Sequence, residues 1–289
     1  MVERLKIAIE KARARRAEHS ADAPRRVGPG HLVTDDVTIP QMPSTNLPAE
    51  RRIDMNSIEE IRLAARALER MRIASGAPQN ARTSDEFDIF RARLLKLCRR
   101  NNWTRIAITA PTRGCGSTTI ALNLAFSLAR SKTLRTLLVD MNLSVPAIAD
   151  RLGIVANLNL PGVLTGSVTP ETLLRRVGTD LAVAANTRPV HPSKLPDLFA
   201  GIQYGLSILT DSLAPDITVL DLPAVLDNED VAEVLKHVDA TVLVASADRS
   251  TAPEIDAAAH LLSERTAYLG VLLNRASKRS RSGADYVGA

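Results

Sequence analysis

Short apolar runs alternate along residues 104–274 with longer segments in which apolar positions recur every three to four residues. Runs of the first kind are typical of buried strands, and segments of the second kind are typical of helices. The pattern predicts strands at 104–110, 134–140, 180–184, 216–221, 240–245 and 268–274. It predicts helices near 117–131, 146–152, 170–176, 195–210, 229–236 and 253–265. This alternation indicates an α/β fold, with a mostly parallel sheet covered by helices on both faces.

Two further helices are predicted before the first strand. Ser57 and Glu60 have the spacing of a capping box. Apolar residues follow on one helical face at Ile61, Ala65, Leu68 and Met71. Ser84 is expected to cap the second helix. Its core side would carry Phe87, Phe90, Leu94 and Leu97.

The N-terminal part of the chain has a different composition. Charged residues dominate residues 1–19, with a sparse apolar stripe, so we expect an amphipathic helix that binds an anionic membrane surface, a partner helix or its own domain. Residues 20–56 are rich in Pro, Asp and Arg and predict a disordered linker. The folded domain is assigned to 57–276, and 277–289 to a basic flexible tail.

Composition limits the protein class. Hydrophobic residues make up 45% of the chain and aromatic residues only 3%, so the core must be aliphatic. No apolar run is long enough for a membrane span, and the N-terminus lacks the apolar segment of a signal peptide. The two cysteines do not suggest a disulfide framework. These features predict a cytoplasmic protein.

Positive charge is concentrated in one part of the chain. The net charge is +5, and residues 89–139 contain ten Lys or Arg and no acidic residue. A positive field around this segment would favour a polyanionic ligand. A basic helix face that meets solvent or an acidic neighbour is the alternative explanation.

The main candidate for chemistry is the loop between the strand at 104–110 and the helix at 117–131. Gly114 and Gly116 allow backbone N–H groups to close on an anion, and the helix N-terminus adds positive potential. The strict phosphate-loop pattern G-x-x-x-x-G-K-[ST] is not met. Pro111 stands at its first glycine, and Ser117 stands at its lysine. Gly116 and Thr118 fit the pattern.

Two acidic residues end predicted strands beside this loop. Asp140 ends the strand at 134–140, and Asp221 ends the strand at 216–221. Ligands of parallel sheets bind at the carboxyl ends of the strands. Carboxylates there hold Mg²⁺ or orient a nucleophile in phosphoryl-transfer sites. A single strand-end Asp is often only a turn or helix cap, but two beside one loop favour a functional pair.

The motifs GCGSTT, LLVDMNLSVP, ITVLDLPAVL, TVLVASADRST and LGVLLNRA occur in this order. Their order and spacing resemble the bacterial tyrosine-kinase family of capsule and exopolysaccharide systems. This family is a branch of the MinD/ParA-like deviant P-loop NTPases. The resemblance covers residues 57–276 and implies a P-loop NTPase-like fold. It also implies the cofactors ATP and Mg²⁺.

The resemblance assigns roles to individual residues. Asp140 and Asp221 match catalytic and magnesium-binding acids, and Thr118 matches the hydroxyl that binds Mg²⁺. Asn274 matches a position that contacts the nucleotide base, with a strand-end turn residue as the alternative interpretation. The nucleotide-binding positions are Arg113, Gly114, Cys115, Gly116, Ser117, Thr118, Thr119 and Asn274. Arg113 belongs to this set as the local cation that could replace the lysine, with an exposed loop cation as the alternative.

Several departures from the family fall on catalytic positions. Ser117 replaces the lysine, and Asn142 replaces a second acid. The tail has one tyrosine, Tyr286, as candidate phosphoacceptor, where the family has several. An oligomerisation motif is only partly kept, at Asp88, Arg91 and Leu94.

The sequence therefore predicts a tyrosine-kinase-like protein of polysaccharide export, with weak or absent autokinase activity and with ATP and Mg²⁺ binding that is weak or lost. The resemblance implies an inner-membrane polysaccharide co-polymerase as partner, homo-oligomers, and peripheral contact at the inner face of the membrane. An active autokinase that uses Arg113 or a residue of a neighbouring protomer is one alternative. A ParA/MinD-like positioning ATPase is the other, but its signature lysine would fall at Thr112. Nucleic-acid binding is not expected.

Overall fold

The computed structural model describes residues 52–63, 68, 72–73, 81–229 and 231–276. The predicted N-terminal helix, most of the predicted linker, and the tail with Tyr286 lie outside the described residues. In the part of the chain that is described, no helix combines the length and apolarity needed to cross a bilayer.

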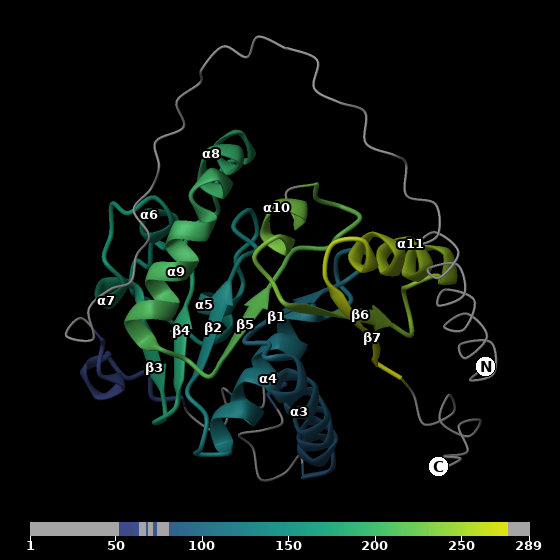
Figure 1. The fold of residues 1–289 in the computed structure, drawn as a ribbon, viewed down its shortest axis with the longest axis horizontal. Helices are drawn as coiled ribbons and strands as arrows, with labels where there is room; N and C mark the ends of the chain where they lie inside the picture. The colour runs from purple at the N-terminus through teal and green to yellow at the C-terminus, as the bar shows by residue number, and fades with distance from the viewer. Residues whose placement is uncertain (1–51, 64–67, 69–71, 74–80, 230, 277–289) are drawn as a thin grey trace, which may run out of the picture. The chain divides into compact units, whose positions relative to one another are not determined.

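A seven-stranded sheet forms the centre of the domain, in the order β3-β4-β2-β5-β1-β6-β7 (Figure 1). The strands are β1 (Arg105–Thr109), β2 (Thr136–Asp140), β3 (Arg175–Val177), β4 (Leu181–Ala184), β5 (Ile217–Asp221), β6 (Ala240–Ser246) and β7 (Ala267–Asn274). All neighbouring strands are parallel except β3 and β4. The predicted α/β class is confirmed, and all six predicted strands are present. The short strand β3 was not predicted.

Helices follow the strands in the predicted alternation. They are α3 (Ala81–Asn101), α4 (Ser117–Arg130), α5 (Ile148–Arg151), α6 (Leu160–Leu164), α7 (Pro170–Leu173), α8 (Leu195–Ala200), α9 (Ile202–Leu213), α10 (Val231–Leu235) and α11 (Ala252–Ser263). Short 3-10 turns occur at Met55–Ser57 and Pro192–Lys194. Helix α6 was not predicted.

Two predicted helices differ from the observed ones. The helix expected at 170–176 ends at Leu173, because the chain becomes extended at Leu174 and enters β3. The helix expected at 195–210 is divided into α8 and α9 at Gly201. In both places a local change of backbone direction interrupts a pattern that is continuous in the sequence.

The prediction of a helix starting at Ser57 is wrong. Ser57 ends a 3-10 turn, and its hydroxyl donates to the Asp54 carbonyl. The following residues run beside β3: Arg176 N–H donates to the Glu59 carbonyl, and Ile61 N–H donates to the Arg176 carbonyl. Pairing with an open strand edge satisfies more backbone groups than the capping box would, and it requires an extended chain.

The folded body begins before residue 57. Ile53 and Met55 are buried, and the Ile53 N–H donates to the Ser212 carbonyl at 2.7 Å. Residues 52–56, which the sequence pattern placed in the linker, are thus packed on the domain.

Helix α3 starts at Ala81, before the expected cap at Ser84, whose hydroxyl instead accepts a hydrogen bond from Arg130. Cys98 is buried on its inner side, whereas Leu97 is 37% exposed, contrary to prediction. Arg91 donates to the Asp88 carboxylate and to the Ser127 carbonyl of α4. Within one chain, the partly kept oligomerisation motif therefore faces α4; homo-oligomer formation stays a prediction.

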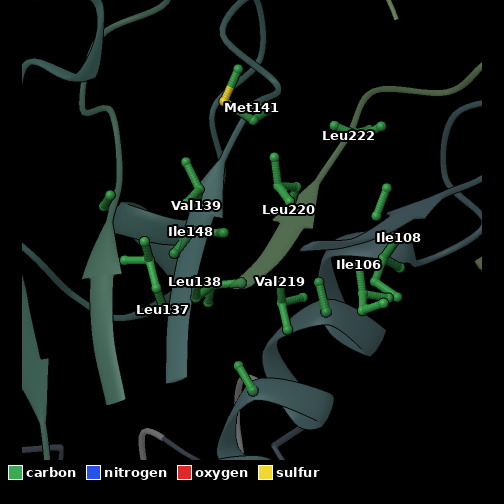
Figure 2. Close-up of a cluster of buried hydrophobic side chains, with 14 of the residues drawn as sticks. Ile106, Ile108, Leu137, Leu138, Val139, Met141, Ile148, Val219, Leu220 and Leu222 are labelled. Atoms are coloured by element: carbon green, nitrogen blue, oxygen red, sulfur yellow. The ribbon is translucent and has the colours of Figure 1, made fainter. Parts of the chain in front are cut away.

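The aliphatic core lies around the central strands. Figure 2 shows Ile106 and Ile108 of β1 near Val219 and Leu220 of β5, with Leu138 of β2 beyond them. Every residue of β2 and of β5 is buried, so both faces of the sheet are covered there. This packing fixes the carboxyl ends of β1, β2 and β5 side by side.

Candidate functional site

The glycine loop between β1 and α4 has the geometry of an anion cradle. Gly114 has φ 85° and Gly116 has φ 93°, a backbone region that L side chains rarely adopt. No group in the described part of the chain accepts a hydrogen bond from the N–H groups of residues 114–119. These free donors surround the N-terminus of the 14-residue helix α4, where a phosphate is favoured.

Asn274, at the end of β7, supports this loop from the side. Its Nδ2 donates to the Cys115 carbonyl at 2.8 Å. A Cβ atom on Gly116 would lie 2.4 Å from the same Nδ2. The amide is thus used to fix the loop, and base contact by Asn274 stays a prediction.

Cys115 contributes its backbone to the loop. Its side chain is 0% exposed, and its Sγ lies 3.3 Å from the Ser250 hydroxyl. A guanidinium covers the neighbouring position, since a Cβ atom on Gly114 would lie 2.8 Å from Arg249 Nη1. The loop is therefore held by contacts with Asn274 and Ser250 and is bordered by Arg249.

Gly116→Ala is expected to lower the free energy of unfolding by about 2–4 kcal/mol, because it combines an unfavourable φ with displacement of Asn274. Gly153→Ala is the matched control, because Gly153 has φ 66° and no atom within 4 Å of its Cβ position. We expect the control to cost about 1 kcal/mol. Urea unfolding of both variants measures the difference, and equal losses would contradict the role of Asn274.

Asp140 and Asp221 are adjacent in the register of β2 and β5. Both are buried, with exposures of 0% and 1%. Asp140 Oδ2 accepts the N–H groups of Ala147 and Ile148, each at 3.0 Å, and its Oδ1 accepts the N–H of Asn142. Burial raises the pKa of Asp140 to about 6, against the lowering effect of these three N–H donors. The carboxylate is thus bound to the loop before α5, and its metal and catalytic roles stay predictions.

Asp221 is different, because neither of its oxygens has a hydrogen-bond partner in the described part of the chain. Burial raises its pKa well above the ordinary value, and the charge of Asp140 raises it further. The Thr118 hydroxyl and the Arg151 guanidinium lower this pKa, although neither is in hydrogen-bonding geometry with the carboxylate. An unpaired buried carboxylate is energetically costly and calls for a cation.

A cavity of about 710 Å³ opens over the loop. The predicted residues Arg113, Gly114, Gly116, Ser117, Thr118 and Thr119 line it, together with Asn142. Asp140, Asp221, Cys115 and Asn274 are not part of its lining. A second hollow, of about 680 Å³, lies beside Asn186 and Arg188 and contains none of the predicted site residues. The chemistry is therefore assigned to the first cavity.

Arg113 lies beside an acidic residue, Asp227. Its side chain is 75% exposed, its Nε lies 3.9 Å from Asp227 Oδ2, and its backbone N–H donates to the same oxygen at 2.9 Å. Asp227 thus lies beside Arg113 in the glycine loop. It was not among the predicted site residues. The signal was the acidic run that begins six residues after Asp221. A phosphate contact by Arg113 stays a prediction.

Arg151 was also missed. It ends α5, lines the cavity, and its Nη1 donates to the Thr119 hydroxyl at 3.0 Å. The predicted helix at 146–152 contained this arginine, but no sequence signal indicates the direction in which its side chain points.

The residues present fit a magnesium ion that is bound together with a phosphate ligand. Among the residues described, no group of three or more His, Cys, Asp or Glu could hold a metal alone. Mg²⁺ is usually bound through one or two carboxylates and substrate phosphates. Asp221, which is unpaired, and Thr118 could supply the protein's share, and a cation there would relieve the repulsion from Asp140.

Comparison with solved structures identifies the fold. The VpsO kinase domain superposes with a TM-score of 0.59 at 23% identity, over 69% of this chain and 98% of that one. The kinase domain of the Escherichia coli tyrosine kinase ETK gives 0.55 at 22%, over 64% and 73%. The chimerical protein CapA2B2 gives 0.62 at 22%, over 76% and 93%. No family model matches the chain, and no curated protein matches it. At these identities the likeness establishes the P-loop NTPase-like fold and nothing finer.

Proposed function

We propose that this chain is a tyrosine-kinase-like P-loop protein of exopolysaccharide or capsule export that binds ATP with Mg²⁺ and has impaired phosphoryl transfer. The observation that carries the proposal is the cradle of free N–H groups at residues 114–119, with Ser117 where a lysine is expected. The order of the sequence motifs supports a role in exopolysaccharide or capsule export. The structural neighbours are named as kinase domains, which supports ATP as the ligand.

Different residues of the site would bind the phosphates and the magnesium ion. The loop N–H groups would hold phosphate oxygens, and Thr118 with Asp221 would hold the magnesium ion, which neutralises phosphate charge when bound. Asp140 keeps the loop after β2 in place through its three backbone contacts.

The impairment follows from what Ser117 and Asn142 cannot supply. Charge-assisted hydrogen bonds contribute about 1.5–3 kcal/mol, against about 1 kcal/mol for a neutral hydroxyl. Loss of one preorganised donor to a transition state costs on the order of 10²–10³ in rate. Asn142 lines the cavity but has no carboxylate to bind a metal or accept a proton.

Ser117→Lys is expected to tighten ATP binding by about tenfold and to raise ATP turnover, because it restores a charge against the phosphates. Calorimetric titration of the full chain and a phosphate-release assay measure both quantities. Ser263→Lys on α11, an exposed site outside the cavity, is the control for added charge.

Two results would contradict the proposal. If neither the wild type nor Ser117→Lys bound a nucleotide, the cradle would have another ligand. If the wild type transferred phosphate to tyrosine at about 1 per second or faster, as kinases do, the impairment would be refuted.

The cellular part of the proposal concerns partners. The protein would act at the inner face of the membrane through a polysaccharide co-polymerase and would form homo-oligomers. The motif order supports this part, and co-purification with the membrane fraction of a polysaccharide-exporting cell tests it.

A further inference from the structure

We propose that Arg151 is the cation that contacts the phosphates of the bound nucleotide in place of the absent lysine. The inference rests on the proposed function, because it requires that the loop binds a nucleotide. It assigns the compensating charge to Arg151 of α5, instead of to Arg113 of the glycine loop.

Arg151 lies next to the glycine loop. Arg151 lines the cavity and donates from Nη1 to the Thr119 hydroxyl at 3.0 Å. Thr119 belongs to the first turn of α4, and its own N–H is one of the free donors of the cradle. The guanidinium is therefore already at the edge of the site that a phosphate would occupy.

The Arg151 guanidinium has donors that are available to a phosphate. Three other arginines line the cavity, and two of them have acidic partners: Arg113 lies by Asp227, and Arg275 lies 3.3 Å from Asp248. The third, Arg72, precedes α3 and is not hydrogen-bonded through its side chain to the glycine loop, as Arg151 is, in the part of the chain described. Among the described residues, no carboxylate forms an ion pair with Arg151. A guanidinium has several donors in a planar fork that matches phosphate. Toward the described residues, Arg151 uses only one of them.

Backbone contacts with Asp140 hold the helix that carries Arg151 in place. Helix α5 is short, and its first turn is fixed by Asp140, whose Oδ2 accepts the N–H groups of Ala147 and Ile148. Asp140 acts on the nucleotide in this view as a positioning residue for Arg151. A preorganised cation loses less entropy on binding than a free surface arginine.

The test is calorimetric titration of the full chain with ATP, ADP and adenosine. Arg151→Gln should weaken ATP binding by about tenfold or more, and ADP binding by less, and should leave adenosine binding unchanged. Arg151→Lys should retain ATP affinity within about threefold, because it keeps the charge. The matched control is Arg275→Gln, which removes a paired charge from the same cavity and should also remain within about threefold.

A rescue experiment separates a phosphate contact from a structural role. In the Arg151→Gln background, Ser117→Lys should tighten ATP binding by more than the tenfold expected in the wild type, because the two cations would serve the same phosphates and their effects would not be additive. Equal losses for adenosine and ATP in a folded Arg151→Gln variant, or a gain from Ser117→Lys no larger than in the wild type, would overturn the inference. If Arg151→Gln impairs folding, a tenfold loss of ATP affinity in Arg151→Lys would overturn it instead. Unchanged ATP binding in Arg151→Gln, with the wild type binding normally, would overturn it while leaving the proposed function intact. Absence of nucleotide binding by the wild type would overturn both.

Discussion

Asp221→Asn is expected to stabilise the nucleotide-free protein by about 1–3 kcal/mol at neutral pH and to abolish its stabilisation by Mg²⁺ with ATP. The native carboxylate is buried, has no hydrogen-bond partner among the described residues and lies beside Asp140. An amide of the same shape removes the buried charge and its repulsion. It also removes the anionic ligand that Mg²⁺ would need.

The pH dependence of this effect follows from the direction of the pKa shift. Burial and the neighbouring Asp140 raise the pKa of Asp221 above its ordinary value of 3.8. Between that value and the raised pKa, the native state binds more protons than the unfolded state, so stability falls as the pH increases. The stabilising contribution is complete below about pH 4 and is lost through the raised pKa. Asp221→Asn should therefore flatten the decline that the wild type shows above about pH 4.

Urea unfolding at a series of pH values, with and without Mg²⁺ and ATP, measures both effects. Asp211→Asn is the control, because Asp211 is an exposed carboxyl on α9, and the wild-type profile should be retained. A nucleotide that binds only the native state raises the free energy of unfolding with its concentration. A less stable Asp221→Asn variant, or one that keeps the full stabilisation by Mg²⁺ and ATP, would contradict the account.

The strands and the glycine loop could be predicted because their signals are local. Apolar runs without helical period gave the strands, and Gly114 and Gly116 are needed where φ is positive. The position of both acids at one edge of the sheet also followed, since parallel strands end on the same side. The predictions of the strands and of the edge that both acids share were therefore confirmed.

The remaining features depend on contacts between distant segments. Glu59 and Ile61 pair with Arg176, which lies more than a hundred residues later, and this pairing excludes the predicted helix start at Ser57. Leu68, a predicted helical position, is helical and buried. Arg151 of α5 contacts Thr119 of α4, and nothing in the sequence around either residue indicates the contact. Side-chain direction and long-range pairing are set by the folded core, so the candidate site was predicted in outline while its cations were not.

Asp140 and Asp221 look equivalent in the sequence, yet Asp140→Ala is expected to destabilise the protein. The substitution leaves three backbone N–H groups, those of Asn142, Ala147 and Ile148, without their acceptor. Each unsatisfied buried donor costs about 1–3 kcal/mol. Relief of repulsion from Asp221 offsets part of this cost, so we expect a net loss of about 2–4 kcal/mol.

Asp140→Asn separates the lost acceptor from the lost charge. The amide oxygen can still accept from Ala147 and Ile148, while one contact, to Asn142, is given up, so the loss should be smaller than for Asp140→Ala. Urea unfolding of both variants beside Asp221→Asn measures the order. Opposite signs at two acids that share one register position would show that one carboxylate builds the loop before α5 and the other is kept for a ligand. A stabilising Asp140→Ala would instead mean that repulsion between the two carboxylates outweighs all three hydrogen bonds.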